Sequence, residues 1–164
     1  MKIGILSDTH NERYLARKAA EIMLSMNIKV IVHCGDVGST RILDELSEFQ
    51  IFLAYGNQDF DRLAIDQKLL QLGDNNKSGK FLQLSFAGKD LFVTHGDDCS
   101  VLNEAINSQR YDYVLSGHTH RFRDQKIAKT RDVNPGALGG RFVEQRSFAI
   151  LDLENDFIER YILY

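Results

Sequence analysis

The sequence predicts an α/β fold in which two mixed sheets pack together, with helices on their outer faces. In the first third of the chain, short apolar runs alternate with segments of helical periodicity, which is typical of parallel strands joined by helices. In the second half, strand-like runs flank short turns and predict hairpins. With 164 residues and no internal linker, we expect residues 1–164 to form a single domain.

The first strand is expected at residues 2 to 7, a continuous apolar run of the kind buried inside a sheet. A helix should follow from about Asn11, which is a suitable N-cap residue before apolar positions at helical spacing. The second strand is expected at residues 29 to 33, and a helix at 39 to 49 with Ser39 or Thr40 as its cap. The third strand is expected at residues 51 to 55.

In the second half, the turn Ala87-Gly88-Lys89 predicts a hairpin of residues 80 to 86 and 90 to 94. A helix at 100 to 108, a strand at 113 to 116 and a last hairpin of residues 148 to 153 and 157 to 163 complete the set. Residues 73 to 80 hint at a phosphate-binding loop, but five residues separate Gly73 from Gly79 where that motif needs four. We therefore interpret this segment as a solvated turn.

The composition excludes some classes of partner. Lys and Arg number 20 and Asp and Glu number 23, which gives a net charge of -3 and argues against binding to nucleic acid or an anionic membrane by bulk charge. No apolar run reaches the roughly 18 residues of a membrane span, and no targeting signal is visible, so we expect a cytoplasmic protein. Two cysteines are too few for a disulfide framework, and we expect Cys34 and Cys99 to be packing residues in a reducing compartment.

Polar side chains follow five of the predicted strands. In α/β proteins, ligands bind outside the carboxyl ends of strands, so we expect these side chains to share one edge of the fold. They are Asp8 and His10, Asp36, Asn57, His95, and His118 and His120.

The chemistry of this set favours a metal site. In an extended backbone, side chains two residues apart point to the same side, so both members of each pair, Asp8/His10 and His118/His120, could face one site. Oxygen and imidazole donors without a thiolate suit Mn²⁺, Fe, Zn²⁺, Ni²⁺ or Co²⁺. Taken alone, each cluster has an ordinary interpretation as a cap, a turn or a surface histidine. The combination is stronger, since only His33, expected in the core or behind the ligands, lies outside the clusters.

The ordered motifs Asp8-x-His10, Gly35-Asp36, Gly56-Asn57, His95-Gly96 and Gly117-His118-x-His120 resemble those of the calcineurin-like metallophosphoesterase superfamily. Among its members, the YfcE-like single-domain phosphodiesterases are the most similar group. The resemblance runs from residue 3 to about residue 140 and includes Asn134-Pro135-Gly136. It implies a four-layer α-β-β-α sandwich with a two-metal centre at the strand ends.

The resemblance also implies a role for each donor. Asp8, His10 and His120 would hold one divalent ion, and Asn57, His95 and His118 the other, with Asp36 as the bridge. Manganese is expected first, with Fe, Zn, Ni or Co as alternatives. The implied reaction is hydrolysis of a small phosphodiester by in-line attack of a metal-bridging hydroxide, with Asp36, His95 and Asn57 as the catalytic residues.

One position departs from the family pattern. Many members carry His after the motif Asn, where it is thought to protonate the leaving oxygen, but this chain has Gln58, which cannot act as an acid. We expect Gln58 and Asn11 to bind substrate, and Asp97, Arg121 and Asn134 are further candidates. The alternative function is a non-catalytic scaffold like the retromer subunit of the same fold. Assembly as a homodimer or homotetramer, frequent among relatives, also stays open.

Overall fold

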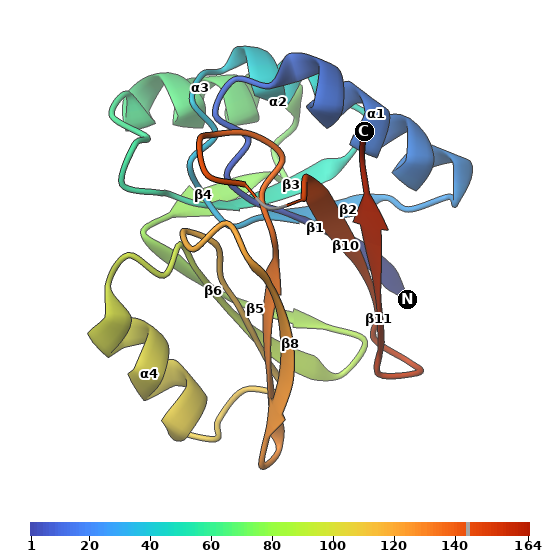
Figure 1. Cartoon of the computed structure of the whole chain (residues 1–164). Coiled ribbons are helices and arrows are strands. Elements are labelled where there is room, and N and C mark those ends of the chain that lie inside the picture. The colour runs from blue at the N-terminus through green and yellow to red at the C-terminus, as the bar shows by residue number, and fades with distance from the viewer. Residues whose placement is uncertain (144) are drawn as a thin grey trace.

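The computed structural model describes residues 1–143 and 145–164 and contains two mixed sheets (Figure 1). The strands of the six-stranded sheet are, in spatial order, β11 (Phe157–Ile162), β10 (Ser147–Asp152), β1 (Lys2–Leu6), β2 (Val30–His33), β3 (Gln50–Ala54) and β4 (Lys77–Gly79). Strands β1 to β4 are parallel, while β10 and β11 form a hairpin that pairs antiparallel with β1.

Three helices cover the outer face of this sheet and provide the crossovers between its parallel strands (Figure 1). They are α1 (Arg13–Ser25), α2 (Arg41–Glu45) and α3 (Arg62–Leu72). Leu15, Ala19 and Met23 recur at helical spacing on the buried face of α1 and pack in one cluster with Ile31 of β2. Burial of this apolar stripe orients α1 on the sheet.

The five-stranded sheet consists, in spatial order, of β5 (Phe81–Phe86), β6 (Lys89–Thr94), β7 (Tyr113–Leu115), β9 (Thr130–Pro135) and β8 (Phe122–Ile127). Strands β6, β7 and β9 are parallel to one another, and the hairpins β5–β6 and β8–β9 complete the sheet. Helix α4 (Cys99–Asn107) covers its outer face by packing Ala105 and Ile106 against Phe92 and Val114.

The inner faces of the two sheets share an apolar core. Ile5 and Val32 of the first sheet lie in one cluster with Val93, Leu115 and Val133 of the second, and all five are fully buried. The order of layers is therefore helix, sheet, sheet, helix, which confirms the expected α-β-β-α sandwich.

Most elements lie where the sequence predicts them, including the first three strands and both predicted hairpins. The prediction that Asn11 caps the first helix is wrong, because α1 begins at Arg13 and Asn11 has a φ of 66° in the loop before it. The segment expected as a solvated turn contains β4, which pairs with β3. Cys34 is buried as expected, but Cys99 is exposed at the start of α4. Helix α3 and the β8–β9 hairpin were not anticipated.

Candidate metal centre

The loops that follow β1, β2, β3, β6 and β7 meet at one edge of the sandwich. Within the first sheet, Asp8 N donates to Gly35 O at 2.9 Å and His10 N donates to Asp36 O at 3.0 Å. Between the sheets, His118 N donates to Asp8 Oδ2 at 2.9 Å. These backbone hydrogen bonds hold loops from both sheets in contact, so donors far apart in the sequence share one site.

One group of candidate ligands combines Asp8, His10 and His120. Asp8 Oδ1 lies 3.7 Å from Nε2 of His10 and 3.2 Å from Nε2 of His120. The two Nε2 atoms are 3.3 Å apart. Three donor atoms that converge in this way can bind one cation.

A second group combines Asp8, Asp36 and His95, whose donor atoms lie within 4.8 Å of one another. Asp36 Oδ2 is 3.7 Å from Nε2 of His10 and 3.5 Å from Nε2 of His95. Asp8 is the residue that the two groups share, and the Asp36 carboxylate lies near an imidazole of each group.

Asn57 and His118 flank His95. Asn57 Oδ1 lies 3.0 Å from Nε2 of His95, and the ring of His118 packs edge-on against the ring of His95 with centroids 5.1 Å apart. His118 is exposed and its ring belongs to neither of the two compact groups of His and carboxylate donors. All seven predicted donors thus gather at one edge, with His118 at its rim.

Hydrogen bonds to backbone carbonyls fix the orientation of two imidazoles. His95 Nδ1 donates to Cys34 O at 2.7 Å, and His120 Nδ1 donates to Arg141 O at 3.2 Å. Because a carbonyl only accepts, each Nδ1 carries a proton, and a neutral ring then presents its Nε2 lone pair toward the carboxylates.

The residues present fit a divalent cation. Asp8 Oδ1 is buried and has no hydrogen-bond partner, whereas Oδ2 of the same carboxylate accepts from Ser7 Oγ at 2.6 Å. A buried carboxylate oxygen without a partner is costly, and a cation at this point would satisfy it. Oxygen and imidazole donors without a thiolate are typical ligands of Mn²⁺, Fe and Zn²⁺.

Carboxylates and imidazoles perturb one another in this centre. Burial alone would raise the pKa of Asp8, but His10 and His120 hold it well below its usual range. Burial likewise opposes protonation of His95, yet Asp36 and Asp8 raise its pKa to about 9. Without bound cations, His95 therefore carries the positive charge that compensates the buried carboxylates.

The backbone conformation of several candidate ligands determines the direction of their side chains. Positive φ values, between 44° and 66°, occur at Asp8, His10, Asp36, His118 and His120. Our expectation that extended backbone brings the i, i+2 pairs together is therefore wrong, although Asp8 and His10 do converge. Left-handed conformations cost energy in non-glycine residues and concentrate at functional sites.

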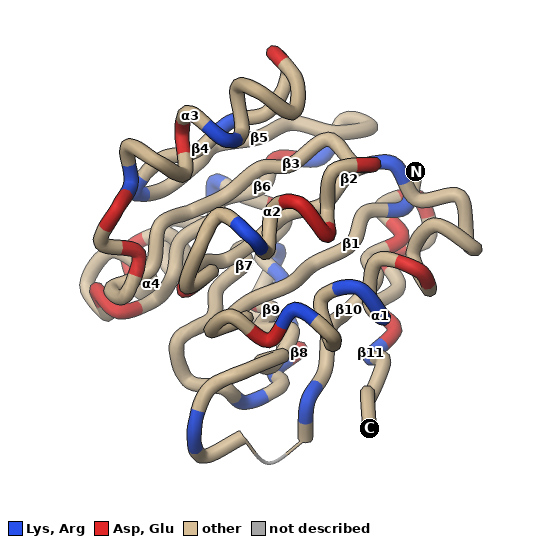
Figure 2. Tube along the Cα trace, turned by 90° about the horizontal axis from the view of Figure 1, so that it is seen from above, with Lys and Arg blue, Asp and Glu red and all other residues tan. Residues whose placement is uncertain are grey.

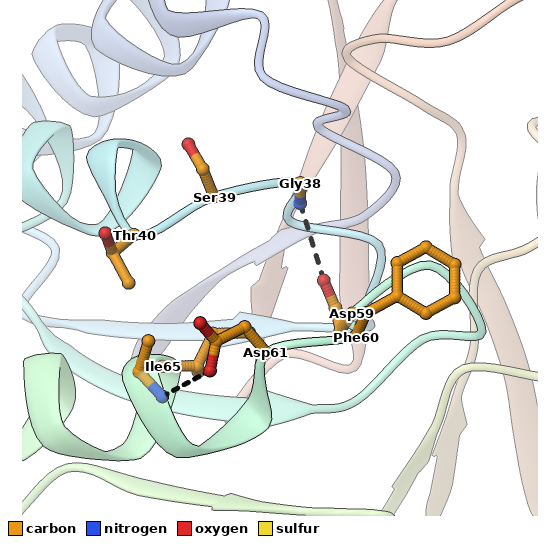
Figure 3. Close-up of a pocket in the computed structure, with 8 residues that line it drawn as sticks. Gly38, Ser39, Thr40, Asp59, Phe60, Asp61 and Ile65 are labelled. Carbon is orange, nitrogen blue, oxygen red and sulfur yellow. Dashed lines mark hydrogen bonds between the residues drawn. The ribbon is translucent and has the colours of Figure 1, made fainter.

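Asp59 is a functional residue that sequence reasoning missed. Its Oδ2 accepts from Asp36 N at 2.9 Å and from Gly56 N at 2.8 Å, and its Oδ1 accepts from Val37 N at 2.8 Å. Oδ1 also accepts from Gly38 N at 3.4 Å (Figure 3). One buried carboxylate thereby organises the loops that carry Asp36 and Asn57. Its place two residues after Asn57 was the available signal.

Gly140 was also missed, because the segment after Pro135 has no strand pattern that leads into the site. A Cβ atom at Gly140 would come within 2.7 Å of His10 Cδ2 and 2.8 Å of His120 Cε1. With a φ of 86°, this position favours glycine on both steric and conformational grounds. Gly140 thus leaves room for the two imidazoles to face Asp8.

The residues that we expected to contact substrate lie either on the exposed rim of the site or in the core of the protein. Asn11, Gln58, Asp97 and Arg121 are exposed near the donors in sequence. Asn134 is buried and donates from Nδ2 to Gly117 O at 2.6 Å, so its predicted role in contacting substrate is wrong.

His33 lies in the core, as expected. Its Nδ1 accepts from Gly35 N at 3.2 Å, so its Nε2 donates to Thr9 Oγ1 at 2.6 Å. Burial lowers its pKa to about 4, which keeps the ring neutral behind the ligand loops.

Fold and donor set together define a class of two-sheet sandwich with a candidate metal centre at one edge. Residues 1–156 match the family model of the calcineurin-like phosphoesterase superfamily domain. Phosphodiesterase MJ0936 of Methanocaldococcus jannaschii is 34% identical over 165 residues, covering 99% of this chain and 99% of the relative. The chain belongs to the calcineurin-like phosphoesterase superfamily.

Solved structures agree with this assignment. A novel archaeal phosphodiesterase superposes with a TM-score of 0.95 at 34% identity, covering 99% of this chain and 100% of that chain. Two more distant proteins share the fold. They are the phosphoesterase YfcE of E. coli, with a TM-score of 0.70 and 18% identity, and Vps29 of Entamoeba histolytica, with 0.71 and 14%, each covering 100% of both chains. Among the described residues, none of the helices has the length and apolar character that crossing a bilayer requires.

Proposed function

We propose that this protein is a metal-dependent phosphodiesterase with two divalent ions at the edge of the sandwich. The observation that carries the proposal is the pair of donor groups that share Asp8, arranged around a buried carboxylate oxygen without a hydrogen-bond partner. The similarity to archaeal phosphodiesterases over almost the whole chain supports the reaction class.

In this proposal, each donor has one position. Asp8, His10 and His120 hold one ion, and Asn57, His95 and His118 hold the other, with Asp36 shared. We expect manganese first, with Fe, Zn, Ni or Co as alternatives. When bound, two such ions lower the pKa of water and neutralise charge on the phosphoryl oxygens during in-line displacement.

The protein's own groups position the reaction. Asp36, His95 and Asn57 form the catalytic set, because the Asp36 carboxylate stands between His10 and His95 while Asn57 meets His95 directly. The backbone N of Gln58 donates to Asp36 Oδ1 at 2.8 Å, which directs Oδ2 toward the imidazoles. The loops therefore set the geometry before substrate arrives.

Substrate contacts come from the exposed rim. The side chains of Asn11 and Gln58 are exposed beside the donors and offer amide groups to phosphate oxygens. Gln58 can donate a hydrogen bond but cannot give up a proton, so good leaving groups should react best. A small phosphodiester fits this rim.

The test is hydrolysis of bis(p-nitrophenyl) phosphate with and without added Mn²⁺, combined with elemental analysis of the purified protein. We expect about two ions per chain, metal-stimulated release of p-nitrophenol, and loss of both in Asp36→Ala. The matched control, Asp44→Ala, removes an exposed carboxylate that pairs with Lys68 and should leave both unchanged. A protein that binds no ion and releases no product would instead support a scaffold of the Vps29 kind.

A further inference from the structure

A cleft of about 430 Å³ opens beside the candidate metal centre and is lined by Asn11, Arg13, Ser39 and Arg41. Two backbone hydrogen bonds connect it to the centre. His10 N donates to Asp36 O at 3.0 Å, and Asn11 N donates to Val37 O at 3.2 Å. The segments that carry His10 and Asp36 therefore run side by side and continue directly into the walls of the cleft.

The cleft has an excess of positive charge. Arg13 Nε and Arg17 Nε donate to the same carboxylate, that of Glu45, at 2.9 and 2.8 Å. One negative charge is thus shared by two guanidinium groups. Arg41 is exposed and forms no ion pair with any residue in the described part of the chain. Figure 2 shows both Lys or Arg and Asp or Glu segments on α1 and α2, the helices that border the cleft.

Three acidic side chains near the cleft have partners of their own, and a fourth, Glu12, places its Cγ 2.8 Å from a Cβ atom built at Gly139. Asp44 pairs with Lys68 at 2.5 Å, and the Asp59 carboxylate accepts backbone N–H groups only. Asp61 accepts from Ala64 N in the first turn of α3 (Figure 3). Among the residues that the structure describes, no carboxylate forms an ion pair with the guanidinium group of Arg41.

Two neutral donors complete the walls. The side chain of Asn11 packs against Gly38, where a Cβ atom would come within 2.7 Å of its Nδ2. Ser39 also borders a second cavity of about 160 Å³ with Asp61 and Ile65, but its hydroxyl points away from these two residues (Figure 3). An amide, a hydroxyl and a guanidinium beside one another form a site suited to an anionic oxygen group.

We propose that this cleft binds a second anionic group of the substrate, with Arg41 as its principal partner. The substrate class is then a phosphodiester in which one alcohol arm ends in a phosphate or a carboxylate. The diester group lies at the metal centre, and the terminal anion lies between Arg41, Ser39 and Asn11. This inference rests on the proposed phosphodiesterase activity and adds a specificity-determining residue to it.

The test uses p-nitrophenyl alkyl phosphodiesters that share a three-carbon arm and differ in its end group. The arm ends in phosphate, carboxylate, methyl or trimethylammonium, and release of p-nitrophenol gives KM and kcat for each. We expect KM to be lowest for the terminal anions and highest for the cation. Arg41→Gln should raise KM for the anionic arms about fivefold, which is the size of one exposed charge contact, while kcat and the KM of the methyl arm stay unchanged.

Lys29→Gln is the matched control, because it removes one exposed positive charge just before β2, at the end of that strand opposite Asp36. Equal KM values for all four arms, with metal-stimulated hydrolysis intact, would overturn the second subsite and leave the proposed function standing. Comparison of the KM values for the phosphate and carboxylate arms identifies which terminal anion the cleft prefers.

Binding without turnover separates the two proposals further. Calorimetric titration of the metal-loaded protein compares propane-1,3-bisphosphonate with propylphosphonate. We expect the bisphosphonate to bind more tightly than the monophosphonate. In Arg41→Gln, the ratio of their two dissociation constants should become about fivefold smaller. An advantage that persists in full in Arg41→Gln contradicts the subsite, whether or not any diester is hydrolysed.

Discussion

The backbone N–H of Asp36 donates a 2.9 Å hydrogen bond to the carboxylate of Asp59. Because the same carboxylate also holds Gly56, it sets the relative position of the loops that carry Asp36 and Asn57. Asp59 is thus a positioning residue for the metal centre.

Asp59→Asn should weaken metal binding. The amide keeps the shape of the carboxylate but replaces one acceptor with a donor that faces backbone N–H groups, so the loops must shift. We expect affinity for Mn²⁺ to fall by about 10- to 100-fold, as measured by calorimetric titration. Asp61→Asn is the control, since Asn caps a helix about as well as Asp and should leave metal affinity unchanged. Equal affinities in both variants would contradict a positioning role for Asp59.

Gly140→Ala should remove one ion of the two. The three atoms nearest to the new Cβ belong to the rings of His10 and His120, so we expect the ion held by these two imidazoles to be lost first. Elemental analysis should therefore show about one metal per chain, with diester hydrolysis largely lost. In Gly88→Ala, where φ is also positive but no atom lies within 4 Å, only stability should change, by about 1–2 kcal/mol. Two retained ions in Gly140→Ala would rule out this arrangement.

Gln58→His should supply the acid that this chain lacks. We expect kcat for poor leaving groups to rise about tenfold or more, because a positioned imidazole can protonate the departing oxygen. A series of methyl aryl phosphodiesters, from p-nitrophenol to unsubstituted phenol as leaving group, measures this as a shallower dependence on leaving-group pKa. Gln58→Ala should keep the steep dependence of the parent protein. An unchanged slope in Gln58→His would mean that position 58 does not face the leaving group.

His33 should make the fold sensitive to acid. Its pKa is about 4 in the folded protein against 6.5 as the ordinary value, so the unfolded chain binds more protons between these limits. Stability is therefore lost as pH falls from about 6.5 to about 4, by on the order of 3 kcal/mol.

Urea unfolding at pH 7 and pH 4.5, after a chelator has removed any bound metal, measures this change in the free energy of unfolding. In His33→Gln, an amide can still donate to Thr9 and accept from Gly35 but does not titrate. The stability difference between the two proteins should shrink on acidification. A difference that does not depend on pH would show that His33 does not carry the effect.

Local pattern was enough to predict much of the fold. Apolar runs identified β1, β2 and β3, and a turn with Gly88 identified the hairpin that follows. Helix α3 was missed because its apolar residues lie on more than one side, with Leu63 and Leu70 exposed and Ile65 and Leu69 buried. Apolar residues spread in this way give little helical periodicity in the sequence, because the helix is stabilised mainly by its tertiary packing.

The β8–β9 hairpin was missed for an electrostatic reason. Its strands carry charges in place of an apolar face, and they pair across the ladder, with Arg123 Nε 2.6 Å from Asp132 Oδ2 and Arg131 Nε 2.7 Å from Asp124 Oδ1. Such pairs are visible only once the strands are aligned.

The donors of the candidate site could be predicted because each follows a strand, and strand ends share an edge. Asp59 and Gly140 could not, since their roles depend on which loops lie beside them. Asn134 was predicted to contact substrate because it lies near a motif, but its side chain donates a hydrogen bond to the backbone instead.

Because Asp8, His10, Asp36 and Asn57 follow strands of one sheet while His95, His118 and His120 follow strands of the other, neither sheet alone can build the centre. Separation of the layers would release the ions, and bound ions would resist that separation. Chelation should then accelerate exchange of backbone amide hydrogens in β2 and β7, whose residues Val32 and Leu115 belong to the apolar cluster between the sheets.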